Sequence, residues 1–170
     1  MPTGLKASSS VVAIGFQVNE TAANTFTQAS VDLNLSPLDR EVFVVLSVQV
    51  DPSTPDAIAS VDTGVNASIT TTSQTALVNL SNSNCLAFAG NAIKAAGFAD
   101  SGVGFTAGLL ETPPATLDYI GIIATYDFFV SIQGTNNTNA KSASGKMYGY
   151  RAVASADIYA ALVQSEVLSA

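Results

Sequence analysis

The chain has 170 residues, and its composition excludes several kinds of chemistry. It contains no histidine and one cysteine, Cys85, which rules out a Ser-His-Asp triad, a Cys-His pair, a histidine-containing metal site and an intrachain disulfide. Six Lys and Arg against thirteen Asp and Glu give a net charge of −7, and the scattered cations argue against direct binding of nucleic acid.

The chain is nevertheless apolar, with 48% hydrophobic and only 11% charged residues. Either small side chains fill the core and much of the surface, or neighbouring subunits cover apolar surface; we favour the second reading. The N-terminus lacks the apolar run of a signal peptide, and no stretch approaches the roughly 20 apolar residues of a membrane-spanning helix. We therefore expect neither a signal peptide nor a transmembrane segment.

The first part of the chain predicts an arm followed by strands. Residues 1–10 contain Pro, Gly and three consecutive Ser, which predicts a flexible N-terminal arm before a single domain over residues 11–170. Alternation of apolar and polar residues predicts strands over residues 12–18, 29–35, 42–50, 65–71, 75–80 and 146–153. The strand over residues 42–50 is apolar on both faces at its start, so we expect it to lie centrally in a sheet.

The middle of the chain is harder to interpret. Residues 87–99 have a helical composition that Gly90 and Gly97 interrupt, and residues 102–108 favour a loop or a bent edge strand. Residues 117–133 carry the longest strand pattern, too long for one simple strand, so we expect a bulge or bend near residues 125–127. Residues 134–145 predict a mobile polar surface loop.

The chain ends in a different pattern. Ser155 can cap a helix and Asp157 falls in its first turn, which predicts a helix over residues 155–168. Such a short amphipathic helix needs a surface to lie on. With no alternation of strands and helices before it, the chain predicts an all-β protein: an antiparallel β-sandwich, in the form of a single jelly roll of seven or eight strands, with a short C-terminal α-helix.

Few residues suggest chemistry. Asp51, Asp56 and Asp62 lie in loops, where carboxylates can hold Ca²⁺, but no calcium-loop spacing accompanies them. We therefore expect no catalytic, cofactor or metal site, and a protein that is not an enzyme. Tyr148, Tyr150 and Tyr159 form either a sugar-binding platform or anchors in the core or at an interface, and we favour anchors. The candidate interface residues are Tyr148, Tyr150, Tyr159, Leu162, Val163 and Val167.

The C-terminal stretch, from Met147-Tyr148-Gly149-Tyr150-Arg151 into the segment 158–168, completes a small acidic β protein with an N-terminal arm. In this the chain resembles the single jelly-roll capsid proteins of tailless icosahedral viruses of prokaryotes. The resemblance implies a structural virion protein that self-assembles in the host cytoplasm, with copies of itself and a second virion protein as partners. Because the arm carries one cation, Lys6, we expect the shell to face a membrane, another protein layer or further copies of the chain rather than nucleic acid.

A second function fits the same fold. A β-sandwich can be a binding module, such as an adhesin, a receptor-binding domain or a carbohydrate-binding domain. In that case the polar loop over residues 134–145 is the expected binding surface.

Overall fold

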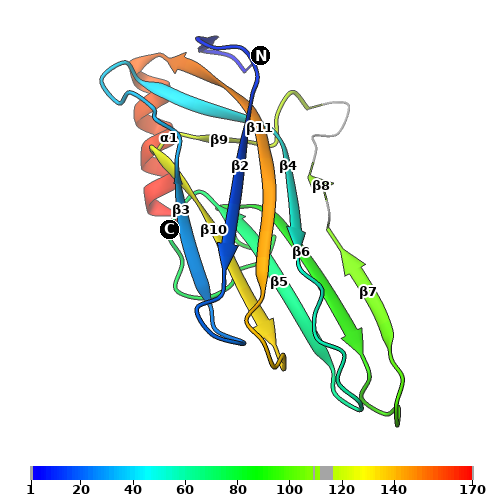
Figure 1. The fold of residues 1–170 in the computed structure, drawn as a ribbon. Coiled ribbons are helices and arrows are strands. Elements are labelled where there is room, and N and C mark those ends of the chain that lie inside the picture. The colour runs from blue at the N-terminus through cyan, green and yellow to red at the C-terminus, as the bar shows by residue number, and fades with distance from the viewer. Residues whose placement is uncertain (1, 109, 112–116, 170) are drawn as a thin grey trace.

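A computed structural model describes residues 2–108, 110–111 and 117–169. The elements follow one another as β1 (Leu5–Ala7), β2 (Val12–Asn19), β3 (Thr27–Asp32), β4 (Glu41–Pro52), β5 (Thr63–Thr70), β6 (Cys85–Lys94), β7 (Val103–Ala107), β8 (Leu110–Glu111), β9 (Gly121–Ile123), β10 (Asp127–Thr135), β11 (Ser142–Ala154) and α1 (Ala156–Leu168) (Figure 1).

The strands form two antiparallel sheets packed face to face, which confirms the predicted β-sandwich. Sheet A has the order β2–β11–β4, with β9 and β8 on the far side of β4 and β1 continuing the edge beside β2. Sheet B has the order β3–β10–β5–β6–β7. The orders β2–β11–β4–β9 and β3–β10–β5–β6 are those of a jelly roll, in which the first strand pairs with the last.

The main core lies between the sheets and depends on two glycines of β11. A Cβ atom on Gly145 would lie 2.7 Å from the ring of Phe16, and one on Gly149 would lie 2.5 Å from the ring of Phe43. The two rings therefore occupy space that only glycine leaves open. The ring of Phe16 meets that of Phe128 edge to face, with 5.7 Å between centroids, which joins sheet A to sheet B.

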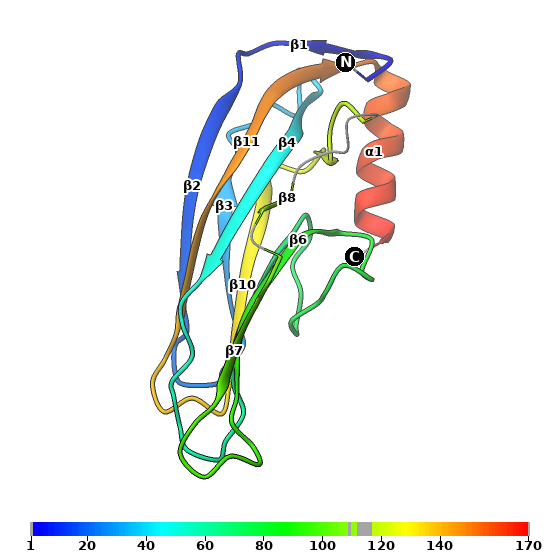
Figure 2. The ribbon, with the colours of Figure 1, turned by 90° about the vertical axis from the view of Figure 1, so that its right-hand side faces the viewer.

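A smaller apolar cluster lies on the outer face of sheet A, where α1 covers it (Figure 2). Its buried members are Leu5, Val42, Val44, Ala124, Ala152 and Ala154. Tyr159, Leu162 and Val163 of α1 pack against them, so the helix has the surface that its short length requires. Burial of both faces at the start of β4 confirms the prediction that this strand is central.

The long strand pattern over residues 117–133 breaks where a bend was expected. Strand β9 belongs to sheet A and β10 to sheet B, so the chain changes sheets across residues 124–126. The change reverses the alternation: Ile123 and Phe128 both face the main core, although they are an odd number of residues apart. A second irregularity lies between Tyr148 and Gly149 of β11, where the register with β4 shifts.

One sequence prediction in the middle of the chain is wrong, and one segment that the sequence left open is resolved. Residues 75–80 form no strand, because both edges of their expected partner β5 are already occupied by β10 and β6. Residues 87–94 are strand rather than helix, since Ala87 and Ala89 face the other sheet and their burial overrides helical composition. The edge strand expected within residues 102–108 is present as β7.

The segment expected to be a flexible arm is partly built into sheet A. Leu5–Ala7 pairs with the end of β11, and Leu5 is buried in the cluster under α1. Gly4 makes this possible, because its φ is +81° and the side chain of Ile158 fills the position of a Cβ. Residue 1 of the arm lies outside the described residues.

We predict that Gly149→Ala destabilises the fold by roughly 1–3 kcal/mol, because the new methyl group overlaps Phe43 and the β4 backbone. Gly104→Ala on β7 is the matched control, since no atom lies within 4 Å of its Cβ position. Urea unfolding followed by circular dichroism measures both variants. Equal midpoints for the two would show that β11 does not pack as described.

Candidate assembly surface

The described residues provide little material for a reactive centre. Among them, no group of three or more His, Cys, Asp or Glu is placed to hold a metal ion. No described helix has both the length and the apolar character needed to cross a membrane. The expectation that the chain is not an enzyme stays a prediction.

The surface is instead marked by exposed apolar side chains. Among the described residues, the large apolar side chains that stand exposed are Val11, Leu38, Leu80, Phe98, Val103, Phe105, Leu117, Tyr126, Val167 and Leu168. Burial of such side chains is favourable, and large exposed patches usually mark contact sites. Seven of these residues belong to two groups, which we call the β7 patch and the helix patch.

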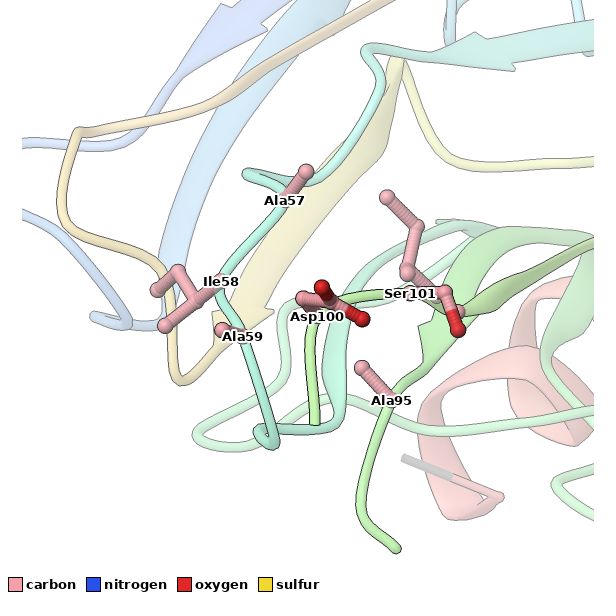
Figure 3. A pocket seen from close by; sticks show the side chains of 8 residues that line it. Ala57, Ile58, Ala59, Ala95, Asp100 and Ser101 are labelled. Atoms are coloured by element: carbon pink, nitrogen blue, oxygen red, sulfur yellow. The ribbon is translucent and has the colours of Figure 1, made fainter. Parts of the chain in front are cut away.

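The β7 patch consists of Phe98, Val103 and Phe105, which are 44%, 47% and 58% exposed. Val103 pairs with Lys94 and Phe105 with Ala92, so both side chains stand on the outer face of sheet B. Next to the start of β7 lies an open depression of about 330 Å³ (Figure 3). Its lining is mostly alanine and isoleucine, from residues 57–59, 93 and 95, with Asp100, Ser101 and Gly102 on the remaining side.

The helix patch is a set of exposed side chains spread along α1 and the segments beside it, namely Leu38, Tyr126, Val167 and Leu168, of which Leu38 is 95% exposed. A groove of about 190 Å³ runs beside it, between the loop at Pro37, the sheet crossing at residues 124–126 and the face of α1 that carries Tyr159 and Val163. Figures 1 and 2 place α1 and β7 at opposite ends of the sandwich. The two patches are therefore separate surfaces.

The predicted interface residues have two kinds of surroundings. Tyr150, Tyr159, Leu162 and Val163 pack against the cluster on sheet A, where they hold the chain's own helix. Val167 is 58% exposed and belongs to the helix patch, while Tyr148 is half-buried on the outer face of sheet A beside Gln49 and Lys146. Contact of any of the six with a neighbouring subunit stays a prediction. The β7 patch was not anticipated, although an edge strand without charged residues could have pointed to it.

A buried carboxylate fixes α1 to the sheet crossing. Glu166 is 7% exposed; its Oε2 accepts a hydrogen bond from the backbone N–H of Ala124 at 2.8 Å, and its Oε1 accepts one from the hydroxyl of Thr125 at 2.6 Å. Burial raises the pKa of the Glu166 carboxyl, and nearby Asp127 raises it further, although the hydrogen bonds oppose the shift. The contact holds the C-terminal part of α1, which carries Val167 and Leu168, against residues 124 and 125.

The loop predicted to be a mobile binding surface directs much of its polarity inward. Buried Glu20 accepts hydrogen bonds from the backbone N–H groups of Gly134, at 2.6 Å, and Lys141, at 2.8 Å. Buried Asn137 donates to the carbonyl of Gly64 at 2.8 Å and accepts from the N–H of Asp56 at 2.9 Å. The turns after β2, β4 and β10 are thus joined at one end of the sandwich.

Two of the three carboxylates considered for Ca²⁺ have other partners, and the third, Asp51, lies in strand β4 rather than in a loop. Asp56 forms an ion pair with Lys141 at 2.5 Å and accepts hydrogen bonds from Thr138 and Asn139, which together lower its pKa. The N–H groups of residues 95 and 96 lower the pKa of Asp62, with a smaller contribution from Lys94. Neither carboxylate is assembled with others into a metal site within the described residues.

We predict that Glu166→Gln makes the protein less sensitive to rising pH. A raised folded-state pKa means that the stabilisation by protonated Glu166 is complete below its ordinary value of 4.5 and is lost as the pH rises through the raised value. The variant should therefore gain stability relative to wild type as the pH rises above about 4.5, measured by urea unfolding. Asp157→Asn, which removes an exposed charge from the same helix, is the control. Parallel curves for Glu166→Gln and wild type would contradict this.

We predict that Asp56→Asn loosens the turn after β10, because it removes the ion pair with Lys141. Because the pKa of Asp56 is lowered in the folded protein, its ionised carboxylate stabilises the fold above pH 3.8. This stabilisation is lost as the pH falls below that value. At neutral pH, the amides of Thr138 and Asn139 should be less protected against hydrogen exchange in the variant than in wild type. In wild type, the same loss of protection should occur only in acid, where Asp56 is protonated. Unchanged protection in the variant would show that the ion pair does not hold the turn.

No protein-family model and no curated protein matches the chain. A chain from a structure of Desmodium yellow mottle tymovirus is similar at 12% identity and a TM-score of 0.28, covering 91% of this chain and 93% of that one. Two structures of turnip yellow mosaic virus are also similar, each with a TM-score of 0.26. The first is 13% identical and the match covers 87% of this chain and 97% of that one. The second is 14% identical and the match covers 91% of this chain and 88% of that one. Values this low assign the chain to no family.

Proposed function

We propose that this chain is a capsid subunit, a structural virion protein that assembles with copies of itself. The observation that carries the proposal is the presence of two separate apolar patches at opposite ends of a jelly roll. Jelly rolls serve in viral capsids, but also in lectins and cupins, so the fold by itself does not select a function. The two exposed apolar patches are the feature that favours assembly over the other functions of this fold.

Two different patches have a geometric consequence. A single self-complementary patch satisfies itself in a two-fold dimer, and growth then stops. With a second patch at the other end, each copy can contact further neighbours, which allows a ring, a closed shell or a filament. The proposal of a capsid requires this second contact, and the helix patch supplies it through Leu38 and Leu168.

Charge determines the conditions for assembly. Each copy carries a net charge of −7, so copies repel one another at long range, and salt screens this repulsion. Apolar contacts are not weakened by salt in the same way. Since β1 carries only Lys6 as a cation, we further propose that the shell faces a membrane or another protein layer, with a second virion protein as a partner, and does not bind nucleic acid directly.

The alternative of a binding module has less support. It requires polar groups in the loop over residues 134–145 to be available to a ligand. Glu20, Asn137 and Asp56 instead use many of the loop's polar groups to join neighbouring turns.

We predict that the purified chain forms discrete particles of one size, and that raising NaCl from about 0.05 M to about 0.5 M promotes their formation. Light scattering gives the mass and negative-stain microscopy gives the shape. Combining Leu38→Lys with Leu168→Lys should reduce the particle mass without changing the thermal unfolding midpoint, because both side chains are exposed. Leu80→Lys, at an exposed position outside both patches, is the control.

A 17.3 kDa monomer at every salt concentration would contradict the proposal. Particles of equal mass from wild type and from the double variant would show that the helix patch is not an assembly contact.

A further inference from the structure

We infer that the free edge of β7 is a contact between copies of this chain, in which two β7 strands pair antiparallel across a two-fold axis. The inference deepens the proposed function and rests on it in one respect, namely that copies of the chain associate. It names the strand, the partner and the register of one contact.

The first ground is the unsatisfied backbone of β7. The strand pairs with β6 along one side, and no other described strand pairs with it. All five of its residues are exposed. A sheet edge presents a row of N–H and C=O groups that another extended strand can satisfy, so the partner that fits it is a strand.

The second ground is that β7 lacks the features that keep sheet edges apart. Natural edge strands are commonly protected by Lys, Pro, inward charges or bulges. The sequence of β7 is Val-Gly-Phe-Thr-Ala, without charge or proline, and its register with β6 is uninterrupted. The opposite edge of the same sheet differs, since Asp32 of β3 lies beside Asp127 of β10. Self-pairing at β3 would place the charged Asp32 in the contact, whereas self-pairing at β7 brings no charged side chain into it.

The third ground is self-complementarity. A two-fold axis at Phe105 pairs every residue of β7: Val103 lies opposite Ala107 of the partner subunit, and Gly104 opposite Thr106 of the partner subunit. Phe105 then lies opposite Phe105 of the partner subunit on the outer face of sheet B, where aromatic cross-strand pairs stabilise sheets. Among the described residues, no strand other than β6 pairs with β7, so the other edge of the strand is open to a partner.

The pairing also explains the exposed apolar side chains of the β7 patch. In the isolated subunit Val103 and Phe105 are 47% and 58% exposed, which is unfavourable in water. In the paired state each lies beside an apolar side chain of the partner strand. The two copies of sheet B then form one continuous sheet.

The test begins with Phe105→Lys, which places a charge opposite its own copy at the centre of the contact. The residue is exposed, so the variant should unfold at the wild-type temperature. Leu80→Lys makes the same chemical change at a position 59% exposed and is the matched control. Sedimentation over a range of concentrations should show self-association weakened by about tenfold or more for Phe105→Lys, and unchanged for Leu80→Lys.

The register is tested by cross-linking in a Cys85→Ala background, which must itself associate as wild type does. With the axis at Phe105, Phe105→Cys brings two thiols directly opposite each other, within reach of a disulfide. Thr106→Cys places its thiols diagonally, at roughly 7–8 Å, and should cross-link poorly. Mild oxidation followed by non-reducing electrophoresis separates the two outcomes.

The outcomes distinguish this inference from the proposed function. Cross-linked Phe105→Cys together with weakened Phe105→Lys supports the β7 contact, even if wild type stops at a dimer and forms no particles, which would overturn the capsid proposal alone. Particles that form equally from wild type and Phe105→Lys would overturn the β7 contact and leave the capsid proposal standing. A wild type that stays monomeric, with freely exchanging β7 amides, would overturn both.

Discussion

The pairing of β11 with β2 on one side and β4 on the other is the constraint on which the rest of the structure depends. It joins the last strand to the first long strand and closes the jelly roll. It is possible only because Gly145 and Gly149 leave room for the rings of Phe16 and Phe43, and the ring of Phe16 in turn contacts sheet B through Phe128. The end of β11 also sets where α1 begins, and so brings the helix back over the outer face of sheet A.

The two ends of the sandwich differ in how their surfaces are satisfied. At one end, the network around Glu20 and Asn137 joins the turns after β2, β4 and β10 and uses much of their polarity internally. At the other end, Glu166 holds α1 against the sheet crossing, but Leu168 at the helix end remains exposed. Apolar side chains therefore remain uncovered on α1 and on β7, far apart on the subunit. We propose that the chain covers this apolar surface by contacting other molecules on more than one side.

The sequence was sufficient for the parts of the fold that depend on local pattern. Alternation predicted the sandwich, the central position of β4 and the bend before β10, and helical spacing predicted α1. It failed where tertiary burial overrides local preference, as at Ala87 and Ala89, and where strand neighbours decide pairing, as at residues 75–80. The candidate interface residues were chosen as large apolar and aromatic side chains, a criterion that cannot separate Tyr159, which packs inside the subunit, from Phe105, which is exposed.

Cryo-electron microscopy of the purified full chain tests the central claim most directly, because it shows both whether copies assemble and which surfaces meet. We predict ordered particles in which each jelly roll contacts its neighbours through the β7 patch and the helix patch. Dispersed single subunits, or ordered particles with Phe105 and Leu168 both facing solvent, would contradict it.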